Sequence, residues 1–202
     1  MQTLRRTLIA LPLLLAALGA HAAAAVGQIA PDFTLQSTEG KPVRLSDLRG
    51  KYVVLEWTNP GCPFVRKHYD SGNMPATQKA AREQGLAWLS VNSTAKASGD
   101  YLEPARLAAW LAERKAQPTA ILMDEEGTVG HAYGARTTPH MYVIDPRGTL
   151  VYAGGIDSIP SARVADIERA TNYVKAALAD IAAQRPITAA ATQPYGCSIK
   201  YK

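Results

Sequence analysis

Residues 52–65 read YVVLEWTNPGCPFV, and this segment is the clearest indication of the fold in the sequence. Its first seven residues are rich in β-branched and aromatic side chains, which predicts a buried strand over Tyr52 to Thr58. A Pro-Gly turn follows, and Pro63 suits the first position of a helix. Cys62 therefore lies at a helix N-terminus, where the helix dipole and free backbone N–H groups favour the reactive thiolate. We predict that Cys62 is a nucleophile; a buried, inert thiol is the alternative.

The rest of the chain alternates strands and helices. Predicted strands are residues 86–92, 119–123, 141–144 and 150–152, with short ones at 30–35 and 43–45; predicted helices follow Pro63, Pro75 and Asp100 and span 128–133 and 164–181. The early alternation predicts a parallel core with crossover helices, and the turn at 145–148 predicts an antiparallel hairpin. We expect one α/β domain over residues 23–185, with a central mixed sheet flanked by helices, an N-terminal β addition and an irregular tail at 186–202.

The first 22 residues predict a secretory signal peptide. Arg5 and Arg6 precede a short apolar run, and Ala20-His21-Ala22 is a small-x-small cleavage pattern. The run is too short to span a membrane, and an uncleaved N-terminal anchor is the alternative. Cleavage would leave about 180 residues, enough for one domain with its own core. We expect a periplasmic or secreted protein with no stable membrane association after cleavage.

Charge and composition exclude several classes of ligand. The 22 basic residues exceed the 17 acidic ones by five, and they are scattered along the chain, so no nucleic-acid partner is expected. Four histidines without close spacing and two distant cysteines predict no metal site. Cys62, His68 and His140 could hold copper only if the fold brought them together. No organic cofactor is expected.

Cys197 is the second of two cysteines and lies 135 residues beyond Cys62. In an oxidising compartment the two thiols can pair, but sequence alone does not say whether they meet. If they do, the pair is either a permanent bridge that holds the tail or a redox couple in which Cys197 resolves a bond made by Cys62. Both interpretations stay open at this stage.

Four segments of the chain resemble the thioredoxin superfamily, in particular exported thioredoxin-like and peroxiredoxin-like redoxins. They are APDFTL at 30–35, VRLSDLRGKYVVLEW at 43–57, GCPFV at 61–65 and YGARTTPHMYVIDPRGTLVYAGGID at 133–157. The resemblance implies a thioredoxin-like fold in which Cys62 is the attacking cysteine. It also implies that Pro139 is the cis-proline beside that cysteine, where it helps to present the substrate backbone, and that Thr138 is the residue before it.

The chain departs from both templates of the superfamily. Val65 stands where the thioredoxin Cys-x-x-Cys motif has its second cysteine, so no dithiol cycle can run within the motif. Leu55 and Asn59 stand where the peroxiredoxin Pro-x-x-x-Thr-x-x-Cys motif has its proline and peroxide-binding threonine. Thr58 is one residue off and could substitute only if the loop shifts. Cys197 is the candidate that fills the place of the missing second cysteine.

Side chains near the two motifs are candidates for supporting roles. Arg66, Lys67 and His68 follow Cys62 on the first helical turns and could add positive charge, although each is also expected as a plain solvated residue. His68 and His140 could stabilise a thiolate or move a proton, or could simply pack. Trp57 is expected in the core or in the wall of the active site.

These observations predict a thiol–disulfide oxidoreductase or a related thiol-based antioxidant protein. It would exchange with a thiol or disulfide protein partner, or act on a small thiol or peroxide. A peroxidase is the second possibility. The third is a non-catalytic binding module in which Cys62 and Cys197 form a fixed bridge.

Overall fold

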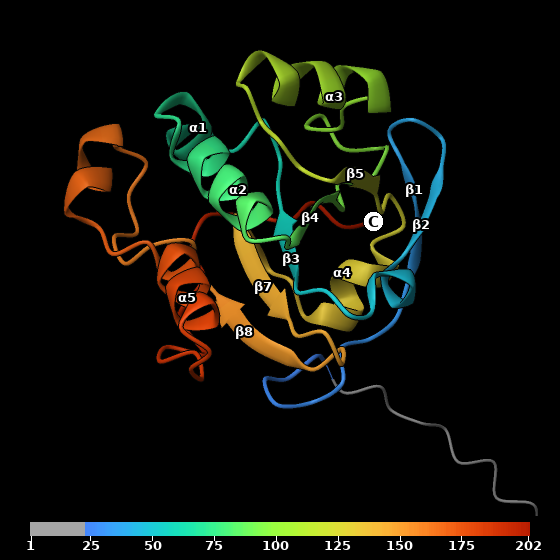
Figure 1. Cartoon of the computed structure of the whole chain (residues 1–202). Coiled ribbons are helices and arrows are strands. Elements are labelled where there is room, and N and C mark those ends of the chain that lie inside the picture. The colour runs from blue at the N-terminus through green and yellow to red at the C-terminus, as the bar shows by residue number, and fades with distance from the viewer. Residues whose placement is uncertain (1–22) are drawn as a thin grey trace, which may run out of the picture.

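The computed structural model describes residues 23–202, so the predicted signal peptide lies outside the described residues. A seven-stranded mixed sheet with strand order β2-β1-β5-β4-β3-β7-β8 forms the centre (Figure 1). Its strands are β1 (Thr34–Ser37), β2 (Pro42–Arg44), β3 (Val53–Trp57), β4 (Ala87–Asn92), β5 (Ala120–Met123), β7 (His140–Ile144) and β8 (Leu150–Gly154). The α/β fold with a central mixed sheet is confirmed.

Helices cover both faces of this sheet. They are η1 (Leu45–Leu48), α1 (Pro63–Asp70), α2 (Asn73–Glu83), α3 (Pro104–Glu113), α4 (Thr128–Tyr133), η2 (Val164–Arg169) and α5 (Tyr173–Ala182). Buried side chains of α1, α2, α3 and α5 share one core cluster, and those of α4 and the N-terminal segment share another. Within the described part of the chain, no helix is both long and apolar enough to cross a membrane.

The central strand β3 explains how the two cores form. Side chains alternate between the faces of a strand, so Val53, Leu55 and Trp57 pack into the cluster that contains α4. Val54 packs into the cluster under α1 and α2. All five residues of β3 are buried, as its composition predicts. The end of β3 is therefore fixed in position, and the turn with Cys62 follows directly at the carboxyl end of this inner strand.

The predicted topology of the core is confirmed. β3 pairs in parallel with β4, and β4 pairs in parallel with β5. β7 is antiparallel to both β3 and β8, and β7 and β8 form the predicted hairpin on one side of the sheet. β1 and β2 form the expected N-terminal addition, and β1 joins the sheet through β5.

Two helix predictions were wrong in their boundaries. The single helix expected over 164–181 is split, because Asn172 begins α5 anew by accepting a hydrogen bond from the Lys175 N–H at 2.9 Å, while Ala170 is extended. The third helix begins at Pro104 with Glu103 at its N-cap, and Asp100 caps nothing. Proline fixes the first helical position, which places the start four residues after Asp100.

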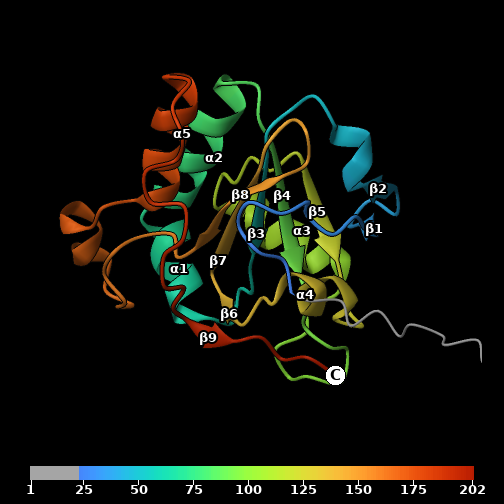
Figure 2. The same cartoon turned by 90° about the horizontal axis from the view of Figure 1, so that it is seen from below.

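The tail is more ordered than expected. Residues 137–138 form β6 and Cys197–Ser198 form β9, and these two strands pair antiparallel to one another. Figure 2 shows the red tail passing α1 and reaching β9 beside β6. The prediction of an irregular tail was therefore wrong at this point, because the partner strand lies about sixty residues earlier and no local pattern announces it.

Candidate active site

Cys62 is the N-cap residue of α1, and Pro63 is the first residue of the helix. The Cys62 N–H donates to the Asn59 carbonyl at 3.0 Å, and the side chain of Asn59 accepts from the Gly61 N–H at 2.7 Å. Asn59, which stands in place of the peroxiredoxin threonine, thus shapes the turn that presents Cys62. The cysteine is only 3% exposed.

Thr138 and Pro139 lie directly at this cysteine. The Cys62 thiol donates to the Thr138 carbonyl oxygen at an Sγ–O distance of 3.1 Å. The peptide bond between Thr138 and Pro139 is cis. The two sequence motifs, 76 residues apart, therefore meet at one place, where the end of β6 faces the start of α1.

The tail brings Cys197 to the same place. In the β6–β9 pair, Cys197 lies opposite Thr138, whose carbonyl accepts from Cys62. The two cysteines, both free thiols, line a common cavity of about 120 Å³. Burial, together with a hydrogen bond to Cys62, raises the pKa of the Cys197 thiol to about 12. Cys62, as the N-cap residue of α1, has the helix-terminal surroundings that favour a thiolate, and Cys197 in β9 does not, so Cys62 is the candidate for first attack.

Glycines allow the tail to lie this close. Gly196 has φ +138°, and a Cβ atom there would overlap the Thr138 carbonyl oxygen. On the protein body, side chains at Gly154 or Gly155 would collide with tail residues 192 and 193, and one at Gly130 with Tyr201. At Gly154, Gly155 and Gly196 the added atom would meet backbone, so these three glycines allow the tail to dock; at Gly130 it would meet only the flexible side chain of Tyr201.

The basic residues after Cys62 do not form the positive cluster that the sequence suggested. Arg66 is exposed, and its Nε donates to the Pro60 carbonyl at 2.7 Å, which braces the turn. Lys67 is fully buried and pairs with Asp157, with an Nζ–Oδ2 distance of 3.1 Å. Burial lowers the pKa of His68 to about 4, so this ring is neutral at pH 7. The expectation that Lys67 and His68 are solvated was wrong, because both are buried, and the neutral His68 ring adds no positive charge.

His140 and Trp57 belong to the core on the other face of the sheet. Burial and the nearby Arg136 lower the pKa of His140 to about 4, and its Nδ1 lies 3.2 Å from the Tyr142 hydroxyl. Trp57 is fully buried, and its ring contacts Tyr133 and Tyr142 at centroid distances of 5.4 and 5.1 Å. Within residues 23–202 neither side chain hydrogen-bonds to Cys62; Trp57 Nε1 donates to the Ser93 hydroxyl at 2.9 Å, and Ser93 lines the cavity of the two cysteines.

One buried carboxylate in β3 was not predicted from the sequence. Glu56 is fully buried on the α1 and α2 face of β3, and four side chains donate to it: Tyr69, Gln78, Trp88 and Ser90 at 2.7 to 3.2 Å. Burial raises the pKa of Glu56 despite these donors. An acidic residue inside an otherwise apolar strand was the signal in the sequence.

We expect Glu56→Leu to lower the free energy of unfolding by about 3 kcal/mol, because the Tyr69, Gln78 and Trp88 donors would stay buried without an acceptor. Denaturant unfolding measures the loss. Glu83→Leu, at an exposed position on α2, is the matched control and should change stability by no more than about 0.5 kcal/mol. Equal stability of the two variants would contradict the role given to Glu56.

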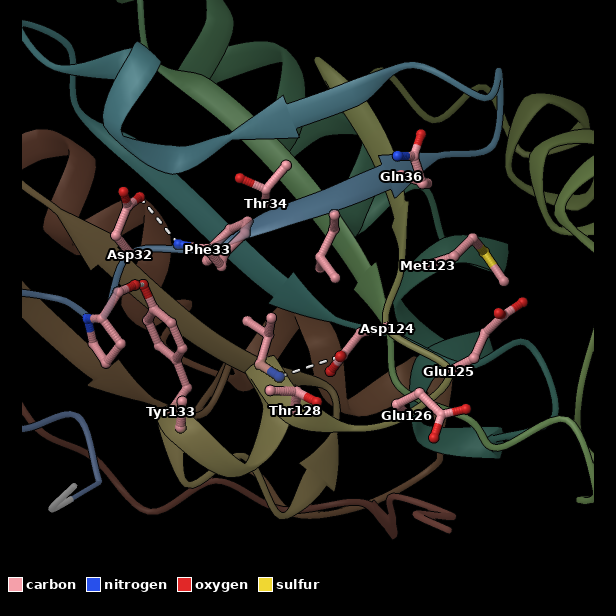
Figure 3. Close-up of a pocket in the computed structure, with 14 residues that line it drawn as sticks. Asp32, Phe33, Thr34, Gln36, Met123, Asp124, Glu125, Glu126, Thr128 and Tyr133 are labelled. Atoms are coloured by element: carbon pink, nitrogen blue, oxygen red, sulfur yellow. Dashed lines mark hydrogen bonds between the residues drawn. The ribbon is translucent and has the colours of Figure 1, made fainter. Parts of the chain in front are cut away.

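A larger cavity, of about 490 Å³, lies away from the cysteines between β1, β5 and α4 (Figure 3). Its acidic side chains are occupied by internal contacts. Asp124 accepts from the Val129 and Gly130 N–H groups, and Glu125 accepts from the Tyr101 hydroxyl. Among residues 23–202 no group of three or more His, Cys, Asp or Glu side chains could hold a metal ion.

Comparisons with known proteins place the chain in a family. The profile of the AhpC/TSA family matches residues 26–153, which include Cys62, Thr138 and Pro139 but not Cys197. The thiol-disulfide oxidoreductase ResA of Geobacillus thermodenitrificans strain NG80-2 is 35% identical over 161 residues, 72% of this chain and 82% of that protein.

Solved structures share the fold. A hypothetical protein of Sinorhizobium meliloti 1021 superposes with a TM-score of 0.74 at 22% identity, over 90% of this chain and 97% of the other. The thioredoxin domain of a thiol-disulfide oxidoreductase from Bacteroides vulgatus gives 0.52 at 23% identity, over 73% and 98%. The fold is therefore thioredoxin-like, and because the family profile spans more than half of the sequence, the chain belongs to the AhpC/TSA family.

Proposed function

We propose that this protein is a thiol–disulfide oxidoreductase whose redox pair is Cys62 and Cys197. One observation carries the proposal: β9 places Cys197 opposite Thr138, whose carbonyl accepts from the Cys62 thiol, and the two thiols line one cavity. The name of the ResA relative supports the same chemistry. Val65 leaves the usual motif without its second cysteine, and the tail supplies one from outside the segment that the family profile matches.

The geometry supports a two-step exchange. The Cys62 thiolate attacks one sulfur of a partner disulfide, which forms a mixed disulfide and releases one partner sulfur as a thiol after it takes up the Cys62 proton. Cys197 then attacks the Cys62 sulfur, the mixed disulfide breaks, and the Cys197 proton goes to the second partner sulfur. Two electrons pass to the partner, while the two thiols of this chain become one disulfide. A partner thiol protein would return the electrons.

The surroundings of Cys62 assign roles to its neighbours. The α1 N-terminus, begun by Pro63, stabilises the thiolate through its dipole. Thr138 and Pro139 would bind the backbone of a partner segment. An extended segment would pair with the edge of β6, which β9 occupies in this structure. Arg66 would act only by bracing the turn before Cys62.

The test uses the reduced protein and a fluorescent peptide disulfide. We expect two peptide thiols to appear for each Cys62–Cys197 disulfide formed, as mass spectrometry and fluorescence together would show. Peptide thiols that appear without this internal disulfide, or no thiols at all, would contradict the proposal. A single-cysteine Cys62→Ser protein is the control for uncatalysed exchange.

A second candidate function rests on Thr58. Its buried hydroxyl is the single buried side-chain oxygen or nitrogen in residues 23–202 without a hydrogen-bond partner, and Thr58 lines the cavity of the two cysteines. A small peroxide could accept from it: Cys62 would take one peroxide oxygen as a sulfenic acid, releasing an alcohol or water, and Cys197 would form the disulfide with loss of water. Faster loss of Cys62 thiol with hydrogen peroxide than with the peptide disulfide would favour this candidate.

We also propose that the protein acts outside the cytoplasm. The proposal rests on the signal-like pattern of residues 1–22, which would be removed to leave the domain at 23–185 and the tail at 186–202. Export suits a redox pair, because thiols of cytoplasmic proteins are kept reduced. A mature protein that begins near residue 23 in the periplasmic fraction would support export, and an uncut chain in the cytoplasm would contradict it.

A further inference from the structure

Tyr195 lies two residues before Cys197, and three side chains of the protein body enclose its hydroxyl. The hydroxyl donates to Oδ1 of Asp157. It accepts from Nζ of Lys67 at 3.2 Å, and Nε2 of His68 lies 3.3 Å away. None of these three residues has a catalytic role in the proposed exchange, and all three contact the tail through Tyr195.

The Lys67 ammonium group has all three of its hydrogen-bond acceptors only when the tail is docked. Its ammonium group has three protons and three acceptors: Asp157 Oδ2 at 3.1 Å, the Ile159 carbonyl at 3.2 Å and the Tyr195 hydroxyl. The side chains of Lys67 and Asp157 are 0% and 2% exposed. A buried charged donor without an acceptor is strongly unfavourable. Lys67, His68 and Asp157 therefore form a binding seat on the protein body, and Tyr195 of the tail fills this seat.

His68 completes the seat in one tautomer. Asn73 Nδ2 donates to His68 Nδ1 at 2.8 Å, which leaves the ring proton on Nε2, facing the Tyr195 oxygen. The ring is neutral at pH 7, because burial holds the pKa of His68 down. The phenol then makes one donated and two accepted hydrogen bonds, which is its full capacity.

The seat and the attacked sulfur belong to one rigid element. Lys67 and His68 lie on α1, the helix whose N-cap is Cys62. The Tyr195 ring packs edge-to-face on Phe64 of the same helix, with centroids 5.8 Å apart. Two extended residues span only about 7 Å, so fixing residue 195 on α1 also confines residue 197.

We propose that Tyr195 is the positioning residue of the redox pair: its hydroxyl, seated among Lys67, His68 and Asp157, holds Cys197 at Cys62. The inference rests on the proposed function for its consequence, since confinement raises the effective concentration of one thiol at the other. It also has a consequence that needs no redox chemistry. The docked tail covers Cys62, so the anchor sets how often a reagent or a partner reaches that sulfur.

The first experiment measures exposure alone. In a Cys197→Ser background, the rate at which iodoacetamide alkylates Cys62 is compared with and without Tyr195→Phe. Loss of hydrogen bonds to charged groups corresponds to about a tenfold change or more in an equilibrium, so we expect alkylation to rise about tenfold. Tyr195→Ala, which also removes the ring, should raise it further. Tyr52→Phe is the matched control, because the Tyr52 hydroxyl makes no hydrogen bond within the part of the chain that the structure covers, and its rate should stay unchanged.

The second experiment measures the redox pair in the protein with both cysteines. In glutathione buffers, Tyr195→Phe should lower the equilibrium constant for closing the Cys62–Cys197 disulfide about tenfold, and Tyr52→Phe should not. Alkylation and disulfide equilibrium that both stay within twofold of the parent proteins would overturn the proposal. If the parent protein closes no disulfide in any buffer, the proposed function falls, and the alkylation rates alone decide whether Tyr195 anchors the tail.

Discussion

Cys62→Ser is expected to reduce thiol–disulfide exchange by at least about a thousandfold, because the hydroxyl is not ionised at neutral pH and cannot form the mixed disulfide. The remaining cysteine does not replace it. Burial raises the pKa of the Cys197 thiol, and its place in β9 serves attack on Cys62 rather than on a partner. Single-turnover reduction of the peptide disulfide measures the loss.

Cys197→Ser should act differently, because it leaves the first step intact. We expect the mixed disulfide between Cys62 and the peptide to accumulate, visible as a stable mass increase, while release of the second peptide thiol stops. The two variants are matched, since each replaces one sulfur by oxygen at one side of the same cavity. Identical behaviour of the two, with no trapped adduct in either, would contradict the assigned order of attack.

Acid pH is expected to destabilise the folded protein because two buried, neutral histidines take up protons on unfolding. The pKa values of His68 and His140 are lowered to about 4, in both cases mainly by burial, whereas an unfolded histidine has a pKa of about 6.5. Between these values the unfolded state binds more protons, so stability rises with pH and is lost as the pH falls from about 6.5 to about 4. The two groups together correspond to a loss of up to about 7 kcal/mol.

Denaturant unfolding at pH 7.5, 6.5, 5.5 and 4.5 tests this expectation. His140→Gln should remove about half of the pH dependence, since it deletes one of the two depressed groups. His131 is exposed, so His131→Gln is the matched control and should leave the pH dependence of stability unchanged. A free energy of unfolding that stays constant from pH 7.5 to 4.5 would show that neither ring is buried as described.

The local features of the site could be predicted from the sequence. The strand at β3, the turn and the helix start at Pro63 follow from neighbouring residues, and α4 spans the predicted residues. The split between η2 and α5 was missed because apolar spacing continues across it, whereas the Asn172 cap overrides that spacing.

The long-range features could not be predicted. Lys67 follows Cys62 on a helical turn and has the composition of a solvated residue, yet its partners Asp157 and Tyr195 come 90 and 128 residues later. Cys197 gave no local signal of its position either, because β9 is two residues long and gains its place from β6 and from the seat of Tyr195. Burial of a charge depends on partners that only the fold brings together.

The central claim is that Cys62 and Cys197 form a reversible redox pair. Mass-spectrometric mapping of the two cysteines in glutathione buffers of graded potential tests it most directly. We predict a Cys62–Cys197 disulfide that opens between about −270 and −120 mV, the range of thiol–disulfide oxidoreductases. A disulfide that resists reduction below about −300 mV, as structural bridges do, or the absence of any disulfide between the two, would contradict it.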